Sequence, residues 1–216
     1  MDTTLIQIFA KAPIEGFVKT RLAEKMGKAA ALLVHQRLCN AMIHRVQAST
    51  TAVRQAEIWV ATPTGMLPSM GECETGILPL RKQPEGDLGA RMGLSIQQGL
   101  KQYHRVIIVG ADAYSVDAHY LAQADHWLKS VDLVIGPAWD GGYVLIGMRR
   151  FIPELFVGIP WGTPRVLSET LLALRQLAVS FVLLPCRWDI DTLEDIRQYA
   201  PELLSGLAST AFNEDR

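Results

Sequence analysis

Three cationic side chains lie close together in the early segment of the chain that covers residues 11–22. Lys11, Lys19 and Arg21 fall within eleven positions, and Gly16 stands between them. Glycine permits backbone angles that other residues avoid, so such a segment can turn its N–H groups and its cations toward one point. Cations and free N–H groups together suit a polyphosphate. The alternative is a solvated loop with incidental charge, and composition alone does not separate the two.

Two familiar phosphate-binding loops do not fit this segment. A P-loop needs glycine directly before its Lys-Thr pair, and Val18 stands there instead, before Lys19 and Thr20. A dinucleotide fold needs a G-x-G-x-x-G pattern after its first strand, and none follows. Any phosphate site in this segment must therefore be of another kind.

Aspartates follow two apolar segments that have the composition of buried strands. Asp112 comes after residues 106–110, and Asp189 and Asp191 come after the last such segment. An extended backbone would place Asp189 and Asp191 on the same side. Asp112 could simply cap the next helix, and Asp191 with Glu194 three positions later resembles a capping pair. If Asp112 and Asp191 instead meet at one sheet edge, their oxygens suit Mg²⁺ or Mn²⁺.

A third cluster with chemical potential covers residues 139–143 and contains an Asp-Gly-Gly sequence. Between two strands this is an ordinary hairpin turn, which accounts for Gly141 and Gly142. The turn interpretation explains less about Asp140 and Tyr143. Asp140 and Tyr143 are therefore the candidates for a functional role in this cluster.

The elements that must position these residues alternate between strands and helices. Strands are expected at residues 5–10, 57–61, 105–110, 133–136, 143–148 and 179–184, with a short one near 77–80; helices are expected at 28–49, 88–102 with Asp87 as its cap, 116–129, 163–177 and 192–200. Residues 11–27 and most of 62–86 are expected to be loops. This alternation predicts an α/β fold, a three-layer α/β/α sandwich with a mainly parallel sheet. The strand at 105–110, apolar on both faces, should be central, and ligands should bind beyond the carboxyl ends of the strands.

Composition limits the classes of protein to consider. The chain has 216 residues and a formal net charge of -1, which suits one domain over residues 1–216 and no nucleic-acid partner. No apolar run approaches the roughly 20 residues of a membrane helix, and no basic region precedes the first apolar run as in a signal peptide. Cys39, Cys73 and Cys186 are scattered and odd in number. They indicate reduced thiols in a cytoplasmic protein, and the oligomeric state is left open.

Taken in order, these motifs resemble the glycosyltransferase-A-like nucleotide-diphospho-sugar transferase superfamily. Within it they look most like the bacterial family of uncharacterised glycosyltransferase-like proteins related to 2-phospho-lactate guanylyltransferase. The matching segments are residues 9–13 with Gly16, 18–22, 86–92, 110–112, 136–138 with 140–143, 161–164, and 189–192 with Glu194 and Asp195. Each segment is weak alone, but the ordered set covers nearly the whole chain.

The resemblance implies a nucleotide-diphospho-sugar transferase (glycosyltransferase-A) fold and a metal-dependent transferase, either a glycosyltransferase or a nucleotidyltransferase. Its donor would be a nucleotide or sugar nucleotide, and its acceptor a small molecule. The implied site residues, in chain order, are Lys11, Lys19 and Arg21 on the phosphates, Gly86, Asp87 and Leu88 near the base or ribose, Asp112 and Asp191 on Mg²⁺ or Mn²⁺ with Asp189 as a less favoured ligand, Asp140, Gly141, Gly142 and Tyr143 on the acceptor side, and Trp161 and Thr163 on the rim.

The sequence departs from the pattern of this family at three positions. Ala111 replaces a serine, and Tyr114 and Leu193 stand where proline is usual. Asp112 and Asp191 are kept, so the metal hypothesis is unaffected. The changes at Ala111 and Tyr114 support an alternative to the enzyme, a non-catalytic protein that binds a nucleotide or sugar nucleotide through a degenerate site. A phosphatase with an aspartate nucleophile is disfavoured, since residues 10–22 contain no aspartate.

Overall fold

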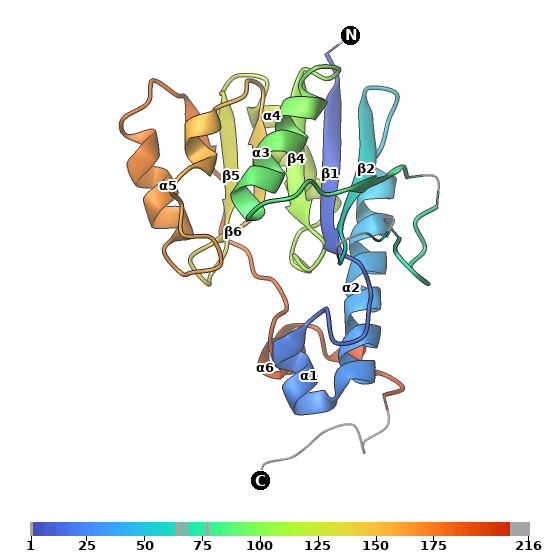
Figure 1. The fold of residues 1–216 in the computed structure, drawn as a ribbon. Coiled ribbons are helices and arrows are strands. Elements are labelled where there is room, and N and C mark those ends of the chain that lie inside the picture. Colours follow the sequence, from blue (N-terminus) through green and yellow to red (C-terminus); the bar gives the residue numbers. More distant parts are fainter. Residues whose placement is uncertain (1, 64–65, 67–68, 77, 208–216) are drawn as a thin grey trace.

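The computed structural model describes residues 2–63, 66, 69–76 and 78–207. At its centre lies a seven-stranded sheet with the strand order β3-β2-β1-β4-β6-β5-β7 (Figure 1). The strands are β1 (Thr4–Lys11), β2 (Arg54–Ala61), β3 (Leu80–Lys82), β4 (Arg105–Gly110), β5 (Leu133–Pro137), β6 (Tyr143–Met148) and β7 (Phe181–Leu183). β6 runs antiparallel to both of its neighbours, and the other strand pairs are parallel. The mainly parallel sheet expected from the sequence is confirmed.

Helices cover both faces of this sheet. They are α1 (Thr20–Met26), α2 (Lys28–Ser49), α3 (Leu88–Gly99), α4 (Ala118–Trp127), α5 (Val166–Leu174) and α6 (Leu193–Tyr199), with the 3₁₀ helices η1 (Pro153–Phe156) and η2 (Pro201–Leu204). Apolar side chains of α2 and α4 pack on one face, and those of α3, η1 and α5 pack on the other. The fold is therefore the expected three-layer sandwich.

The central strand is β4, whose side chains belong to the apolar cores on both faces of the sheet. Ile107 and Val109 enter the core under α2 and α4, whereas Val106 and Ile108 enter the core under α3 and α5. All four are 4% exposed or less. A strand buried on both faces cannot lie at an edge of the sheet, so the pattern predicted its place correctly.

A helical lobe lies beyond the sheet edge at which the parallel strands end. It consists of α1, the first half of α2, α6 and η2, which share a third apolar core (Figure 1). The expectation that residues 11–27 form only a loop is wrong, because α1 begins at Thr20. Leu22 and Met26, four positions apart, are buried in the core of the lobe. No side chain caps this short helix, so the usual signal of a helix start is missing.

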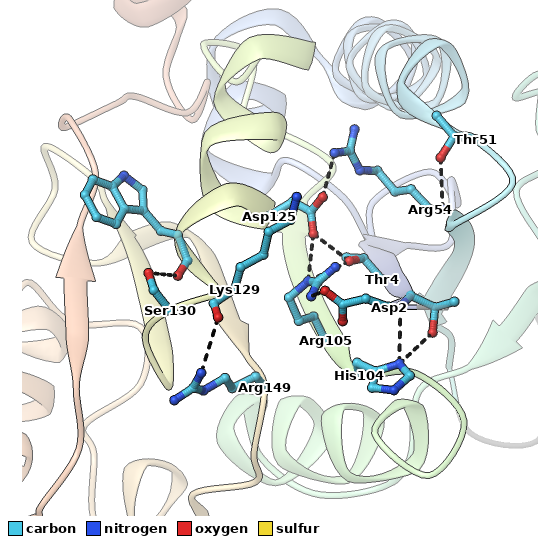
Figure 2. A network of polar contacts seen from close by, with 12 residues as sticks. Asp2, Thr4, Thr51, Arg54, His104, Arg105, Asp125, Lys129, Ser130 and Arg149 are labelled. Atoms are coloured by element: carbon cyan, nitrogen blue, oxygen red, sulfur yellow. Dashed lines mark hydrogen bonds and ion pairs between the residues drawn. The ribbon is translucent and has the colours of Figure 1, made fainter.

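At the opposite end of the sheet, where β1, β2 and β4 begin, a buried polar network joins the strands (Figure 2). The carboxylate of Asp125, on α4, accepts hydrogen bonds from Thr4 at 2.5 Å, Arg54 at 2.7 Å and Arg105 at 2.9 Å. These partners lie at the starts of β1, β2 and β4, so one side chain joins three strands to a helix. Buried charges are tolerated when they are paired in this way.

Element boundaries differ modestly from the sequence expectations. Asp87 caps α3 through a 2.8 Å hydrogen bond from the Ala90 N–H group, as expected. The helices α3, α4 and α5 are shorter than the predicted segments. The short strand expected near 77–80 is found as β3 at Leu80–Lys82, and residue 77 lies outside the described residues. Within the described part of the chain, no helix combines the length and the apolar character needed to cross a membrane.

Candidate functional site

A cavity of about 500 Å³ opens at the sheet edge where β1 and β4 end, next to the helical lobe. This is the edge at which parallel α/β sheets bind ligands. Among the residues that line it are Lys11, Lys19, Arg21, His35, Gln83, Leu88, Arg91, Asp112, Asp140, Gly142, Tyr143, Trp161, Thr163, Asp189 and Asp191. Of the residues predicted for the site, Gly86, Asp87 and Gly141 are not part of this lining.

Lys19 lies between the two carboxylates that the sequence proposed as metal ligands. Its ammonium nitrogen is 2.8 Å from Asp112 Oδ2 and 2.8 Å from Asp191 Oδ1, and it also donates to the carbonyl of Ile190 at 2.6 Å. Burial alone would lower the pKa of Lys19, but the two carboxylates outweigh it and raise the pKa. Asp112 and Asp191 therefore meet around a cation, although they are distant in sequence.

The helix-cap interpretation of Asp191 is wrong. Thr192 is the residue that caps α6, and it forms a capping box with Asp195 rather than with Glu194. The hydrogen bonds that a cap must provide come from Thr192 and Asp195, one position later than expected. The carboxylate of Asp191 is thus available to the cavity, where it meets Lys19.

Asp112 is not the cap of α4 either. That helix is capped by Asp117, which accepts a 2.7 Å hydrogen bond from the Tyr120 N–H group. The backbone carbonyl of Asp112 accepts from the N–H group of Ile190 at 3.2 Å. This bond holds the segment before α6 against the end of β4, which brings the two carboxylates into one site.

Asp189 supplies a third carboxylate to this centre. One oxygen each from Asp112, Asp189 and Asp191 lie within 4.8 Å of one another. No described residue donates a hydrogen bond to Asp189, and burial, together with the charges of Asp112 and Asp191, raises its pKa to about 7. Hard oxygen donors around a point already held by a cation fit Mg²⁺ or Mn²⁺.

The other two predicted phosphate-binding cations reach the same cavity with more freedom. The side chain of Arg21 is 74% exposed, and its nearest carboxylate oxygen, on Asp191, is 3.8 Å away. Lys11 is exposed, and its ammonium lies 5.9 Å from the centre of the Phe17 ring. Both side chains can therefore move onto a ligand, whereas Lys19 is already engaged.

The hairpin between β5 and β6 forms one wall of the cavity. Asp140 Oδ1 accepts a 2.8 Å hydrogen bond from the Gly142 N–H group, which fixes the carboxylate at the turn. Gly141 has φ 88°, and a Cβ atom there would lie 2.1 Å from the carbonyl oxygen of Pro164. Gly141 therefore serves the turn and its packing, while Asp140 and Tyr143 face the cavity.

Aromatic side chains complete this wall. Tyr143 packs edge-on against Trp161, with the ring centres 6.1 Å apart, and burial raises the pKa of the Tyr143 hydroxyl. Trp161 and Thr163 also line the cavity. This wall offers apolar ring surface beside the carboxylate of Asp140.

The wall on the β2 side contains residues that sequence reasoning missed. Gln83 donates from Nε2 to the carbonyls of Ala10 and Trp59, at 3.2 and 2.9 Å. These two bonds fix the orientation of the amide, with its NH₂ group toward the two carbonyls and its oxygen away from them. Arg91 donates to the carbonyl of Gly86 at 2.8 Å, which orders the turn before α3. Leu88 lines the cavity close to them, while Asp87 serves as the helix cap.

His35 is a further missed residue, and it lies beneath the first loop. Its Nε2 atom is 3.0 Å from the carbonyl oxygen of Lys11, and burial lowers its pKa. A histidine inside the long helix α2 carries no spacing signal in the sequence. Only the packing of α2 under the loop brings it to the cavity.

Tyr114, which replaces the usual proline in the turn after Asp112, is held by several contacts. The Arg45 guanidinium lies 4.5 Å from the centre of the Tyr114 ring and donates to the carbonyl of the same residue. The Tyr114 hydroxyl donates to Glu202. These contacts anchor the turn after Asp112 to α2 and η2.

Solved structures share this fold over almost the whole chain. A candidate nucleotide-diphospho-sugar transferase from Desulfovibrio desulfuricans G20 is 27% identical, with a TM-score of 0.81 over 99% of this chain and 92% of that one. A nucleotidyl transferase from Methanothermobacter thermautotroptrophicus is 14% identical (TM-score 0.59, 92% and 97% covered). A cytidylyltransferase from Leptospira borgpetersenii serovar Hardjo-bovis is also 14% identical (TM-score 0.57, 100% and 99% covered). The fold predicted from the resemblance is confirmed.

No curated protein matches the chain. The sequence does match a family described as "Uncharacterized protein conserved in bacteria (DUF2064)" over residues 42–163, which is more than half of its length. That segment covers β4, Asp112 and the hairpin that carries Asp140. The chain belongs to the DUF2064 family.

Proposed function

We propose that this chain is a metal-dependent transferase that acts on a nucleotide or a nucleotide-diphospho-sugar. The observation that carries the proposal is the cluster of the Asp112, Asp189 and Asp191 carboxylates at the ligand-binding end of the sheet, two of which pair with the ammonium of Lys19. The structural neighbours, described as nucleotidyl and sugar-nucleotide transferases, support it.

The cavity suits a nucleotide in size and in charge distribution. Its volume of about 500 Å³ lies within the usual range for small-molecule sites. The carboxylates and the cations lie beside the helical lobe, so the diphosphate belongs at this end. The base and ribose would then extend toward Gln83 and Leu88, where a fixed amide and an apolar surface are available.

Asp112 and Asp191 would hold a divalent ion, with Asp189 completing the set. When bound, the ion would neutralise the negative charge of a diphosphate. Arg21 and Lys11 would add positive charge where the leaving phosphate develops negative charge. Asp140, fixed by the turn, would orient the acceptor or accept its proton. The acceptor would attack phosphorus in a nucleotidyl transfer and a sugar carbon in a glycosyl transfer. Both reactions would use this arrangement of residues, so only their products distinguish them.

Binding is tested first, by calorimetry with a panel of nucleoside triphosphates and sugar nucleotides, with and without Mg²⁺ or Mn²⁺. The test variant is Asp112→Asn, and the matched control is Asp117→Asn. The control removes a carboxylate from the same β4–α4 connection, and asparagine is as good a cap as aspartate. We expect Asp112→Asn to abolish metal-dependent binding and Asp117→Asn to leave it unchanged. Equal affinities for the wild type and Asp112→Asn would contradict the proposed site.

Turnover is tested next with the nucleotide that binds. Release of pyrophosphate would identify nucleotidyl transfer, and release of a nucleoside diphosphate would identify sugar transfer. Metal-dependent binding without either product, over a broad set of acceptors, would favour a non-catalytic binding protein. The Ala111 and Tyr114 departures would then mark a site that has lost its chemistry.

A further inference from the structure

Lys19 lies between two of the carboxylates proposed as metal ligands, and it is held there firmly. Its ammonium makes two ion pairs of 2.8 Å and one hydrogen bond to a carbonyl, and the side chain is 7% exposed. Oxygen ligands of Mg²⁺ lie about 2.1 Å from the ion. An ion and an ammonium cannot both lie between the same two carboxylate oxygens.

The backbone of Lys19 is also unusual. It has φ 45° and ψ 51°, and it is the only described residue other than glycine with a positive φ. Residues other than glycine rarely adopt this left-handed backbone conformation. Strained positions of this kind are common at sites that switch between states. Lys19 thus combines an ammonium held by three contacts with a backbone conformation that residues other than glycine disfavour.

We infer that Lys19 is a built-in counter-cation that keeps the carboxylates of Asp112 and Asp191 together in the metal-free protein and must leave when a divalent ion binds. The inference rests on the proposed function, because it takes the carboxylates as metal ligands. A divalent ion held by these carboxylates would displace the ammonium, and Lys19 would then be a free cation beside the phosphates of the donor.

Metal affinity is the first test, measured with Mn²⁺ alone and no nucleotide, by titration calorimetry. The variants are Lys19→Met, which removes the charge, and Lys19→Gly, which also relieves the backbone strain. Lys25→Met is the matched control, because Lys25 is an exposed lysine on α1. We expect both Lys19 variants to bind Mn²⁺ about tenfold or more tightly than the wild type, since no ammonium competes for the carboxylates. The control should not differ from the wild type.

The second test follows Lys19 in the unmodified protein, so it does not depend on a variant folding. Amines are labelled with an acetylating reagent and the labelled sites are read by mass spectrometry. Lys19, which is buried in the metal-free protein, should be labelled slowly, and Mn²⁺ alone should increase its rate about tenfold or more, since a freed side chain is solvent-exposed. Lys25 should be labelled at one rate throughout.

The possible failures are distinguishable. If the wild type binds Mn²⁺ while the Lys19 variants bind it equally or more weakly, or if Lys19 stays protected at saturating Mn²⁺, then Lys19 does not compete with metal and the inference is overturned. The proposed function survives that result. If neither the wild type nor the variants bind Mn²⁺, the inference and the metal-dependent function fail together.

Discussion

Replacement of Asp189 by asparagine should stabilise the metal-free protein, and the gain should depend on pH. Burial and the neighbouring carboxylates raise the pKa of Asp189 from 3.8 to about 7 in the folded protein. The native state therefore holds this proton more tightly than the unfolded state. The free energy of unfolding should fall as pH rises from about 4 to about 7, and then level off.

The size of the effect follows from the two pKa values of Asp189. Each pKa unit corresponds to about 1.4 kcal/mol, so a rise from 3.8 to about 7 costs the folded state about 4 kcal/mol at high pH. Part of this cost is already present at about pH 5. The advantage of Asp189→Asn over the wild type should therefore grow by about 3 kcal/mol between about pH 5 and pH 8.

Urea unfolding with a chelator present, at both pH values, measures this difference. Asp132→Asn is the control, since hydrogen bonds from Ser180 and Arg149 overcome burial and hold the pKa of Asp132 at about 2. That carboxylate is ionised throughout the range, so its variant should differ from the wild type by the same amount at both pH values. If the advantage of Asp189→Asn changes by less than about 0.5 kcal/mol between the two pH values, burial and the neighbouring carboxylates do not raise the pKa of Asp189.

Three further variants separate stability from binding. Thr192→Ala should cost about 1 kcal/mol of unfolding free energy through loss of the α6 cap and leave Mn²⁺ affinity unchanged; a loss of affinity would mean that the cap also positions Asp191. Arg21→Ala should weaken nucleotide binding by about 1–3 kcal/mol in calorimetry while its thermal midpoint stays near that of the wild type, and the reverse pattern would make Arg21 structural. Asp125→Asn should cost about 3 kcal/mol in urea unfolding, because Arg54 and Arg105 lose their charged partner. Nucleotide affinity should not change, since Asp125 lies at the end of the sheet opposite the cavity. Hydrogen bonds lower the pKa of Asp125 despite burial, so this contribution should be present at neutral pH and be lost as pH falls below about 4.

The main features of the fold could be predicted because they depend on apolar patterns. β4 is apolar on both faces, which predicts a central strand, and α2 was predicted with its observed ends, Lys28 and Ser49. The sequence does not indicate α1, because its start carries no capping side chain and because only Leu22 and Met26 mark its apolar side. A short helix of this kind is stabilised mainly by packing on its neighbours, which no local pattern records.

The candidate site could be predicted as a set of residues but not as a set of contacts. The rule that strand ends share one sheet edge was enough to expect Asp112 and Asp191 together. The same rule could not show that Lys19 lies between them, since an ion pair over 172 positions leaves no local signal. Gln83 and His35 were missed for the same reason, because their positions depend on how β3 and α2 pack.

The wide separation of Lys19 and Asp191 along the chain also bears on synthesis. A ribosome releases the chain from its first residue onward, so β1, β4 and α1 leave it long before Asp191 does. Until α6 is released, the apolar sides of α1 and α2 lack Ile190 and Ile196, which complete the core of the helical lobe. During that interval the lobe exposes apolar surface, which makes an incomplete chain prone to aggregation, and Lys19 has no Asp191 to pair with. The two ion pairs of Lys19 can therefore form together only after Asp191 has left the ribosome.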